Sequence, residues 1–352
     1  MLVLSKSDAK VKPFTELSNI FAEKIETVLM KRVIGIGNAL VDIMVGIPGE
    51  EILKEFSLPK GSMQLVDETR SESVKYGIRN FSMSVSSGGS VANTIHALGI
   101  LGASPGYIGS VGHDETGDFF SNDLQGAGAD PVLFRRSSPT GTAVALVTPD
   151  SERTFATHLG AAVELNLEEM NDELFKGYDI LYVEGYLILN FDLVERACQI
   201  AKAAGMEVAL DLSSYNVVED NLESFKKIVS GYVDILFANE DEARAFTGLE
   251  PEQALTEMAE MCGISVVKTG SRGSMIKRGE EVVRVGIIDV NPVDTTGAGD
   301  MYAAGFLYGY CKDEPLDRCG AYGALLAGSV IEYMGAKLPP EKWPSIKTQL
   351  NH

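Results

Sequence analysis

Short β-branched runs alternate with helix-spaced apolar segments along most of the chain. The strand-like runs include residues 32–37, 180–183, 207–210, 233–237 and 264–268. Between them, segments such as residues 191–204 and 222–229 place apolar residues three and four positions apart, the spacing that buries one face of a helix. This alternation predicts an α/β fold in which helices cover a mainly parallel sheet.

Two stretches lose the helical spacing and predict a separate β structure. Residues 45–66 and 133–159 consist of short extended pieces bounded by turn residues. In the second stretch, Pro149-Asp150 lies between strand-like flanks, a pattern typical of a β-hairpin. We expect the two stretches to form a small discontinuous lid within a domain that spans residues 32–345.

Charge and cysteine content narrow the class of protein. The chain has 352 residues, 30 Lys+Arg and 50 Asp+Glu, so its formal net charge is −20. The electrostatic field of a protein with this net negative charge repels phosphodiester backbones and anionic lipids, so we expect neither a nucleic-acid nor a membrane partner. No apolar run reaches the roughly 20 residues needed to span a bilayer. The four cysteines lack CxxC spacing, which favours a reduced, cytoplasmic protein.

Residues 1–31 differ from the rest of the sequence. Their apolar residues from Phe14 to Val28 recur at three- and four-residue spacing, which predicts a short amphipathic helix. Charged residues interrupt any secretory apolar core. We therefore treat residues 1–31 as an extension outside the fold.

Several familiar nucleotide and metal motifs are missing from the sequence. It contains no Gly-Lys dipeptide and therefore no P-loop. After Gly35-Ile-Gly37, Leu40 occupies the position of the third glycine of a dinucleotide-binding fingerprint. The four histidines have no paired His/Cys spacing, so a zinc site is not expected.

The strongest chemical signal is the sequence Asp294-Thr-Thr-Gly-Ala-Gly-Asp300, which leads into an apolar helical run. Amides of Gly297, Ala298 and Gly299 would converge at the positive end of the helix dipole and form an anion hole. Asp300 in the first turn would remain a carboxylate, ready to accept a proton from a hydroxyl. The pattern therefore suits phosphoryl transfer to an alcohol. In the simpler alternative, these residues only cap the helix and form its entry turn.

A second glycine-rich turn has similar features. Gly88, Gly89 and Ser90 precede a helical run, with Asn93 one turn further on. Backbone amides at a helix start, together with a polar side chain, favour binding of hydroxyl groups.

Asn38 and Asp42 lie four positions apart near the first strand. In an extended chain they would project from the same face, where an amide and a carboxylate could hold a vicinal diol. The alternatives are a turn residue for Asn38 and a surface residue at a strand end for Asp42.

Together these motifs resemble the two signature regions of the PfkB, or ribokinase-like, carbohydrate and nucleoside kinases. The matching segments are Gly88-Gly-Ser-x-x-Asn93, the Gly-rich run up to Asp114, and Asp294 to Asp300. The resemblance covers about residues 32–340 and is strongest to the adenosine-kinase branch. It implies a three-layer α/β/α sandwich with a mainly parallel central sheet and a small β lid.

The resemblance also implies an activity and a set of site residues. The enzyme would transfer the γ-phosphoryl group of ATP to the 5′-hydroxyl of a ribonucleoside, most readily adenosine. Asp300 would be the general base, and residues 297–299 would hold the transferred group as charge develops. The acceptor would contact Asn38, Asp42, Gly88, Gly89, Ser90, Asn93, Leu65 and Tyr186. ATP would contact Asn239, Thr269, Gly270, Gly273, Thr295, Gly297 and Gly299.

Some of these residues have competing interpretations. Asn239 and Glu242 match a family motif associated with Mg²⁺, and they also fit a helix capping box. Asp294 would support K⁺ or the phosphates, or would hydrogen-bond its own turn. Leu65 and Tyr186 would enclose a purine or pack in the lid. We expect Arg135, Arg136 and Arg153 to be surface residues, with a phosphate contact from the lid as the alternative.

Two other functions remain open. One is a sugar kinase of the same family, of ribokinase or fructokinase type. The other is a catalytically silent ligand-binding relative, which the complete anion-hole sequence and Asp300 argue against. A homodimer formed through the lid would be consistent with either kinase.

Overall fold

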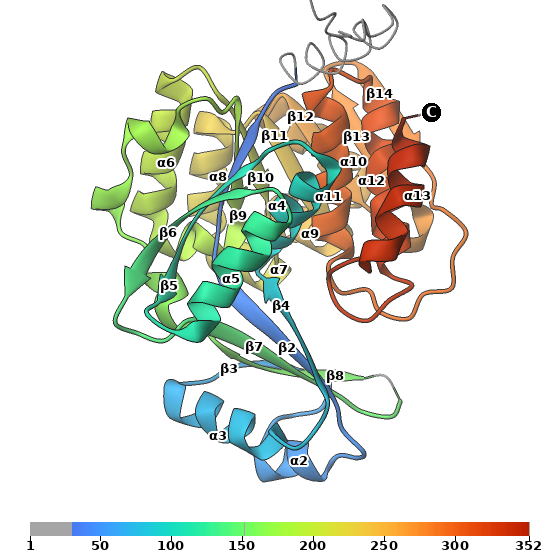
Figure 1. The fold of residues 1–352 in the computed structure, drawn as a ribbon. Helices are drawn as coiled ribbons and strands as arrows, with labels where there is room; N and C mark the ends of the chain where they lie inside the picture. The colour runs from blue at the N-terminus through green and yellow to red at the C-terminus, as the bar shows by residue number, and fades with distance from the viewer. Residues whose placement is uncertain (1–29, 151, 352) are drawn as a thin grey trace, which may run out of the picture.

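The computed structural model describes residues 30–150 and 152–351. A large α/β domain carries a small lid at one end (Figure 1). The helix predicted between residues 14 and 28 lies outside the described residues. Lys31, which we had placed in the extension, is anchored to the large domain. Its amide donates to the Cys311 carbonyl over 3.0 Å, and its ammonium group pairs with Glu207 at 2.7 Å.

A nine-stranded sheet forms the middle layer of the large domain. Its order is β14-β13-β12-β11-β10-β9-β1-β5-β6, and every neighbouring pair is parallel except β12–β13 and β13–β14. These strands span Val33–Ile36 (β1), Gly106–Gly112 (β5), Asp130–Arg136 (β6), Ile180–Glu184 (β9), Glu207–Asp211 (β10), Ile235–Asn239 (β11), Ile264–Lys268 (β12), Ser274–Arg278 (β13) and Glu281–Val285 (β14). The central strands are buried on both faces, which explains their unbroken apolar runs.

Helices cover both faces of this sheet and give the predicted three layers. One hydrophobic core lies beneath α4 (Ser90–Leu101), α5 (Glu115–Gly126), α11 (Ala298–Cys311), α12 (Leu316–Val330) and α13 (Trp343–Leu350). The other lies beneath α6 (Phe191–Ala203), α8 (Leu222–Tyr232), α9 (Glu240–Thr247) and α10 (Pro251–Met261), with α7 (Tyr215–Asp220) beside α9. The mainly parallel α/β/α sandwich is therefore confirmed.

The lid is a five-stranded sheet with the order β3-β8-β7-β2-β4. Its strands are β2 (Leu40–Gly46), β3 (Met63–Leu65), β4 (Met83–Gly88), β7 (Gly141–Val147) and β8 (Arg153–His158). Two helices, α2 (Glu51–Glu55) and α3 (Glu68–Ile78), pack on this sheet around buried Leu53, Val74 and Val144. The predicted hairpin is present, because β7 and β8 pair antiparallel.

The extent of the lid differs from the sequence expectation of residues 45–66 and 133–159. In the structure it takes in residues 40–88 and 141–158, including two helices, whereas β6 belongs to the large sheet and pairs with β5. As an edge strand, β6 is only half-buried. Its mixed pattern of polar and apolar residues therefore resembles that of a lid strand.

The chain passes between the two sheets at two places that position the site. It leaves β1 at Ile36 and enters β2 at Leu40, and it returns from β4 at Gly88 directly into α4. Both crossings lie beside the carboxyl ends of the parallel strands, where ligands bind in open α/β sheets.

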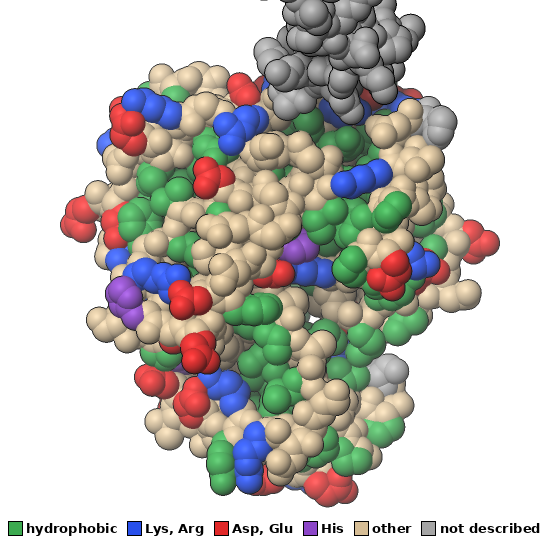
Figure 2. Space-filling model, in the orientation of Figure 1, with side chains coloured by type: hydrophobic (Ala, Val, Ile, Leu, Met, Phe, Trp, Pro, Cys, Tyr) green, Lys and Arg blue, Asp and Glu red, His purple; other side chains and the backbone are tan. Residues whose placement is uncertain are grey.

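Acidic and basic side chains are interspersed over the face drawn in Figure 2, and hydrophobic side chains gather where the lid meets the large domain. Among the described residues, no helix is long and apolar enough to cross a membrane.

Candidate active site

The turn before α11 has a conformation that requires glycine. Gly297 adopts φ +74°, and a Cβ atom there would lie 2.6 Å from the Cα of Ala336. The amide of Ala298 donates weakly to the Thr295 carbonyl over 3.3 Å. Amides in the first turn of a helix lack intrahelical acceptors, so Gly299 and Asp300 present theirs at the positive end of α11.

The turn before α4 is equally restricted. Gly89 adopts φ +96°, and a Cβ atom there would lie 2.2 Å from the carbonyl oxygen of Asn38. A Cβ atom on Gly88 would fall 2.3 Å from the carboxyl carbon of Asp42. Both glycines therefore let the polar groups of the β1–β2 crossing approach the start of α4.

Asp300 joins the two glycine-rich turns. Its carboxylate accepts hydrogen bonds from the Ser90 hydroxyl at 2.7 Å and from the Asn93 amide at 2.8 Å. The Thr94 hydroxyl donates to its backbone carbonyl over 3.0 Å. Within the described part of the chain, the buried Oδ1 of Asn93 has no hydrogen-bond partner. Ser90 and Asn93, which we expected to contact the acceptor, thus also orient the expected base.

The surroundings of Asp300 set its proton affinity. Burial raises the pKa of this carboxyl to about 6, against the hydrogen bonds from Asn93 and Ser90. Asp211 raises the pKa further and Lys268 lowers it. An acid with a pKa near neutrality is well matched to proton transfer from a hydroxyl.

A buried charge cluster lies beside the anion-hole turn. The Lys268 ammonium group pairs with Asp211 at 2.9 Å and lies 3.2 Å from where a Cβ of Gly299 would be. Burial lowers the pKa of Lys268, but Asp211 and Glu242 outweigh it, so the net shift is upward. The lysine therefore stays charged and faces the position expected for a transferred phosphoryl group.

A second buried acid, Glu184, lies at the end of β9. It accepts hydrogen bonds from the Asn38 side chain at 2.6 Å and from the amides of Asn38 and Val91 at 3.3 and 3.4 Å. Burial raises its pKa to about 7 despite these bonds. Asn38 is thus held at the crossing between the sheets, while Asp42 lies in β2, so the two side chains do not share one strand face as we expected.

A cavity of about 570 Å³ opens above Asn38. Of the expected acceptor residues it is lined by Asn38, Leu65, Gly89, Ser90 and Tyr186, together with Glu184. Apolar side chains, among them Met63, Leu65, Val163, Leu187 and Leu189, make up most of the rest of its lining. Gly88, Asp42 and Asn93 do not line this cavity and lie beside it.

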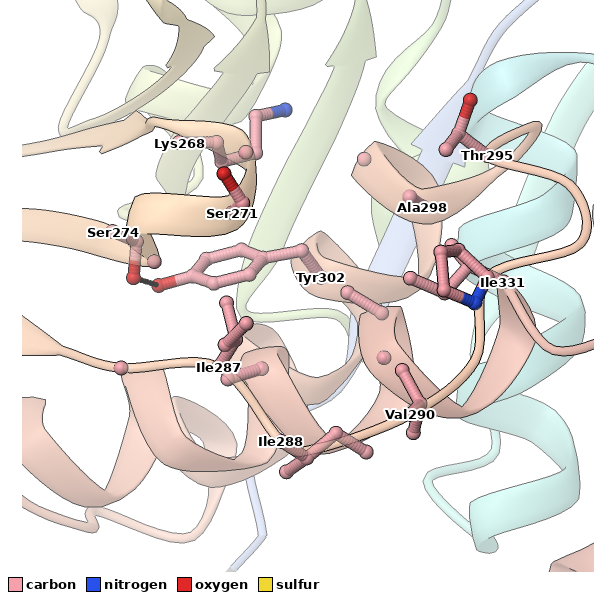
Figure 3. Close-up of a pocket in the computed structure, with 18 of the residues that line it drawn as sticks. Lys268, Ser271, Ser274, Ile287, Ile288, Val290, Thr295, Ala298, Tyr302 and Ile331 are labelled. Atoms are coloured by element: carbon pink, nitrogen blue, oxygen red, sulfur yellow. Dashed lines mark hydrogen bonds between the residues drawn. The ribbon is translucent and has the colours of Figure 1, made fainter.

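A second cavity, of about 450 Å³, lies on the other side of the α11 turn (Figure 3). Of the expected ATP residues it is lined by Gly270, Gly273, Thr295 and Gly299. Apolar side chains of Ile287, Ile288, Val290 and Ile331 line it, together with Lys268 and the hydrogen-bonded Tyr302–Ser274 pair.

Three expected ATP or metal residues have structural roles here. Asn239 and Glu242 form a reciprocal capping box at the start of α9, with both N···O distances to the backbone close to 2.8 Å. The Thr269 hydroxyl donates to the Gly273 carbonyl within its own turn. Burial raises the pKa of Glu242, and nearby Asp211 adds to the shift. No group of three or more His, Cys, Asp or Glu within the described residues is arranged to hold a metal ion.

Asp294 takes the second of its two expected roles and hydrogen-bonds its own turn, whereas Arg153 is not the surface residue that we expected. The Asp294 carboxylate is buried and pairs with Arg153 of lid strand β8. It also accepts bonds from the amides of Thr296 at 2.7 Å and Gly335 at 2.8 Å. A protein guanidinium group is thus the counter-ion of this carboxylate in the structure. Arg153 is correspondingly not a solvated surface residue.

Sequence reasoning missed Glu184 and Asp211 altogether and did not foresee the charge of Lys268 in the site. All three are the last residues of apolar strands in the parallel sheet: Glu184 of β9, Asp211 of β10 and Lys268 of β12. A polar residue that ends a buried strand was therefore the available signal, because these ends converge at the ligand-binding edge. The Arg153–Asp294 pair joins residues 141 positions apart and had no local signal.

Comparison with known proteins agrees with this geometry. The chain resembles a probable sugar kinase from Rhizobium etli, with a TM-score of 0.82 and 34% identity over 92% of this chain and 99% of that one. An adenosine kinase from Sinorhizobium meliloti gives a TM-score of 0.80 and 36% identity over 91% and 99%. An uncharacterized sugar kinase from Archaeoglobus fulgidus is 30% identical over 68% of this chain and 96% of that protein.

The profile of the pfkB family carbohydrate kinases matches residues 62–343. That span includes both glycine-rich turns, Asp300 and most of the lid. The family resemblance inferred from the sequence is therefore confirmed, and so is its ribokinase-like fold. Asp300 lies in the first turn of α11, bonded to Ser90 of one cavity and next to Gly299 of the other. The chain belongs to the pfkB carbohydrate kinase family and is a phosphotransferase that acts on an alcohol group.

Proposed function

We propose that this kinase transfers the γ-phosphoryl group of Mg-ATP to the 5′-hydroxyl of a ribonucleoside, with adenosine as the preferred acceptor. The observation that carries the proposal is the position of Asp300 between two cavities. Ser90 lines one cavity and donates to Asp300, while Gly299 lines the other and precedes Asp300 in the chain.

Asp300 would take the proton from the acceptor hydroxyl. With a pKa raised to about 6, it is mostly ionised at neutral pH and still basic enough to accept a proton as the new O–P bond forms. Its hydrogen bonds with Ser90 and Asn93 fix the direction of the carboxylate. The acceptor hydroxyl would approach from the side of the acceptor cavity.

The donor side would stabilise the transferred group. Amides at the start of α11 and the Lys268 ammonium group both face the phosphoryl position, and charge there spreads over the equatorial oxygens in the transition state. Mg²⁺ would enter with the nucleotide and neutralise charge between its phosphates. The apolar side chains that line this cavity suit a nucleobase.

The shape of the acceptor cavity favours a nucleoside over a free sugar. Its volume of about 570 Å³ lies within the usual range for small-molecule sites, roughly 300–1,000 Å³. Ser90 in its lining donates to Asp300, Asn38 pairs with Glu184 in the same lining, and most of the other lining residues are apolar. A ribose held beside Ser90 and Asn38 would leave a purine against apolar side chains such as Leu65 and Leu189.

A sugar kinase is the second candidate, and the buried Asn38–Glu184 pair favours it because such a pair can bind ring hydroxyls. The two functions are separated by measuring ADP release with Mg-ATP and adenosine, guanosine, inosine, ribose, fructose or fructose 6-phosphate. Phosphorus NMR of the product then identifies the phosphorylated position. Turnover of adenosine to its 5′-phosphate supports the proposal, whereas turnover confined to a sugar rejects it.

The variant Leu65→Ser sharpens this comparison. It should raise the KM for adenosine by about tenfold, because one buried apolar contact is worth roughly 1–3 kcal/mol. The KM for any sugar that also reacts should change little, since a sugar would not reach this part of the cavity. An equal effect on both acceptors would contradict the purine position.

A further inference from the structure

The segment after α12 forms a wall of the anion hole. The amide of Gly335 donates to the Asp294 carboxylate over 2.8 Å. The backbone of Ala336 packs so closely on Gly297 that a Cβ there would lie 2.6 Å away. Any shift of residues 335–337 would therefore move the turn that begins α11.

Lys337 connects this wall to the base of the lid. Its ammonium group lies 2.5 Å from the Ser87 hydroxyl at the end of β4 and 2.5 Å from a carboxylate oxygen of Asp123 on α5. Asp123 in turn accepts bonds from the Ser87 hydroxyl at 2.6 Å and from the Ser87 amide at 3.1 Å. The lysine side chain is only 14% exposed, so it is a buried clamp and not a surface charge.

The same clamp lies next to Asp42. Ser87 is followed by Gly88, and the Asp42 carboxylate occupies the place where a Gly88 side chain would be, 2.3 Å from the Cβ position. Burial raises the pKa of Asp42 to about 6, Lys337 acts to lower it and Asp300 to raise it.

The cross-strand partners of Asp42 are uncharged. Its partners across the sheet are Ser86 on β4 and Ala143 on β7. Two further titratable groups lie beside Lys337: Asp123 on α5 and His96 on α4. Burial lowers the pKa of His96 to about 4, so this histidine is neutral at physiological pH. Lys337 is therefore the cation that lowers the pKa of Asp42, whereas the charge of Asp300 raises it.

We propose that Lys337 is a positioning residue for the acceptor: it clamps the anion-hole wall to the acceptor-binding turn and keeps Asp42 as a carboxylate able to accept hydrogen bonds from a vicinal diol. The inference rests on the proposed function and on the expectation from the sequence that Asp42, which lies beside the acceptor cavity next to Gly88, contacts the acceptor. The Lys337 side chain would thus link the turn before α11, which faces the donor cavity, to the turn before α4, which faces the acceptor cavity.

The test compares the pH dependence of kcat and of the acceptor KM in the wild-type enzyme and three variants. Lys337→Met should raise the acceptor KM about tenfold at pH 7 and move the midpoint of its pH dependence upward, since tenfold corresponds to one pK unit. At saturating acceptor and high pH, only the effect of the lost clamp on the anion-hole wall should remain, so kcat should fall by a smaller factor than the acceptor KM rises at pH 7. Lys337→Arg keeps the charge and should restore the wild-type profile.

Asp123→Asn is the matched control, because it breaks the same ion pair from the other side. It leaves the lysine without its neutralising partner, so the midpoint should move downward. A merely structural clamp predicts shifts in the same direction, or equal losses at all pH values, for Lys337→Met and Asp123→Asn. Either of those results overturns the proposal.

A measurement that does not depend on catalysis separates this inference from the proposed function. Carbon-13 NMR of aspartate-labelled protein follows the Asp42 carboxyl, with Asp42→Asn to assign its signal. An unchanged midpoint in Lys337→Met overturns the inference whatever the acceptor is. If a sugar proves to be the acceptor, the proposed function fails and the kinetic comparison is made with that sugar.

Discussion

At the scale of single residues, the site depends on side chains whose charge is costly to bury. Asp300, Asp42 and Glu184 all have pKa values raised mainly by burial. Such carboxyl groups destabilise the fold in their ionised form and gain from a ligand that supplies hydrogen bonds. The carboxyl groups expected to act on the substrates are therefore groups whose ionised form lowers the stability of the unliganded fold.

Asp300→Asn tests this directly. We expect kcat to fall by roughly 10²–10⁴, the usual contribution of a general base. The melting temperature should not fall, because asparagine keeps the shape and removes a charge that burial disfavours. Steady-state kinetics and thermal unfolding of the same preparation check both statements. Activity within about tenfold of wild type would show that another group takes the proton.

Gly88→Ala tests the contact between the acceptor turn and Asp42. The new methyl group would overlap the Asp42 carboxyl, and such overpacking costs about 1–3 kcal/mol. We expect the acceptor KM to rise about tenfold or more, with the KM for ATP unchanged. Gly231→Ala is a matched control, since a Cβ there meets nothing within 4 Å. Equal kinetics for both variants would contradict the contact.

At the scale of elements, the lid hairpin and the anion-hole turn are joined by one buried ion pair. Arg153 belongs to β8, and Asp294 lies in the loop that leads to α11. Ordering of the lid and ordering of the anion hole are thus linked, which suits an enzyme that must exclude water from its phosphoryl donor.

Arg153→Met should destabilise the protein by roughly 3–5 kcal/mol, because it leaves the Asp294 carboxylate buried without its counter-ion. Asp294→Asn added to the same chain should recover part of this loss. Arg135→Met, which removes a more exposed pair with Asp118 and a hydrogen bond to the Gly112 carbonyl, should cost less, about 1–2 kcal/mol. Denaturant unfolding of the four proteins measures these differences. Equal losses for Arg153→Met and Arg135→Met would show that burial of the pair adds nothing.

At the scale of the whole molecule, the raised pKa values predict how stability depends on pH. A folded carboxyl group with a pKa of about 6 to 7 binds a proton more readily than the same group in the unfolded chain. Between about pH 5 and 8 the folded state therefore binds more protons, and stability falls as pH rises.

The unliganded protein should consequently melt at a higher temperature at pH 5.5 than at pH 8. Glu184→Gln should flatten this slope, because Glu184 titrates near pH 7 in the fold. Exposed Glu281→Gln should leave the slope unchanged. A wild-type melting temperature that rises with pH across this range would contradict the assignment of these buried acids.

Much of this protein was determined by local sequence. The unbroken apolar strands and helix-spaced segments predicted the parallel sandwich, because burial on both faces leaves a pattern that can be read along the chain. Gly297 and Gly89 were recognisable because only glycine tolerates their backbone conformation. Asp300 could be named because a helix start after a glycine-rich turn is itself an anion site.

Other features were decided by the tertiary structure alone. Assignment of β6 to the large sheet depended on its partner β5, and the roles of Glu184, Lys268 and Lys337 depended on residues far away in the chain. Arg153 looked like a surface residue until its strand met Asp294. Electrostatic energy depends on distance and burial in space and not on separation in sequence. The sequence thus indicated the reacting groups, whereas only the folded chain determined which charges surround and control them.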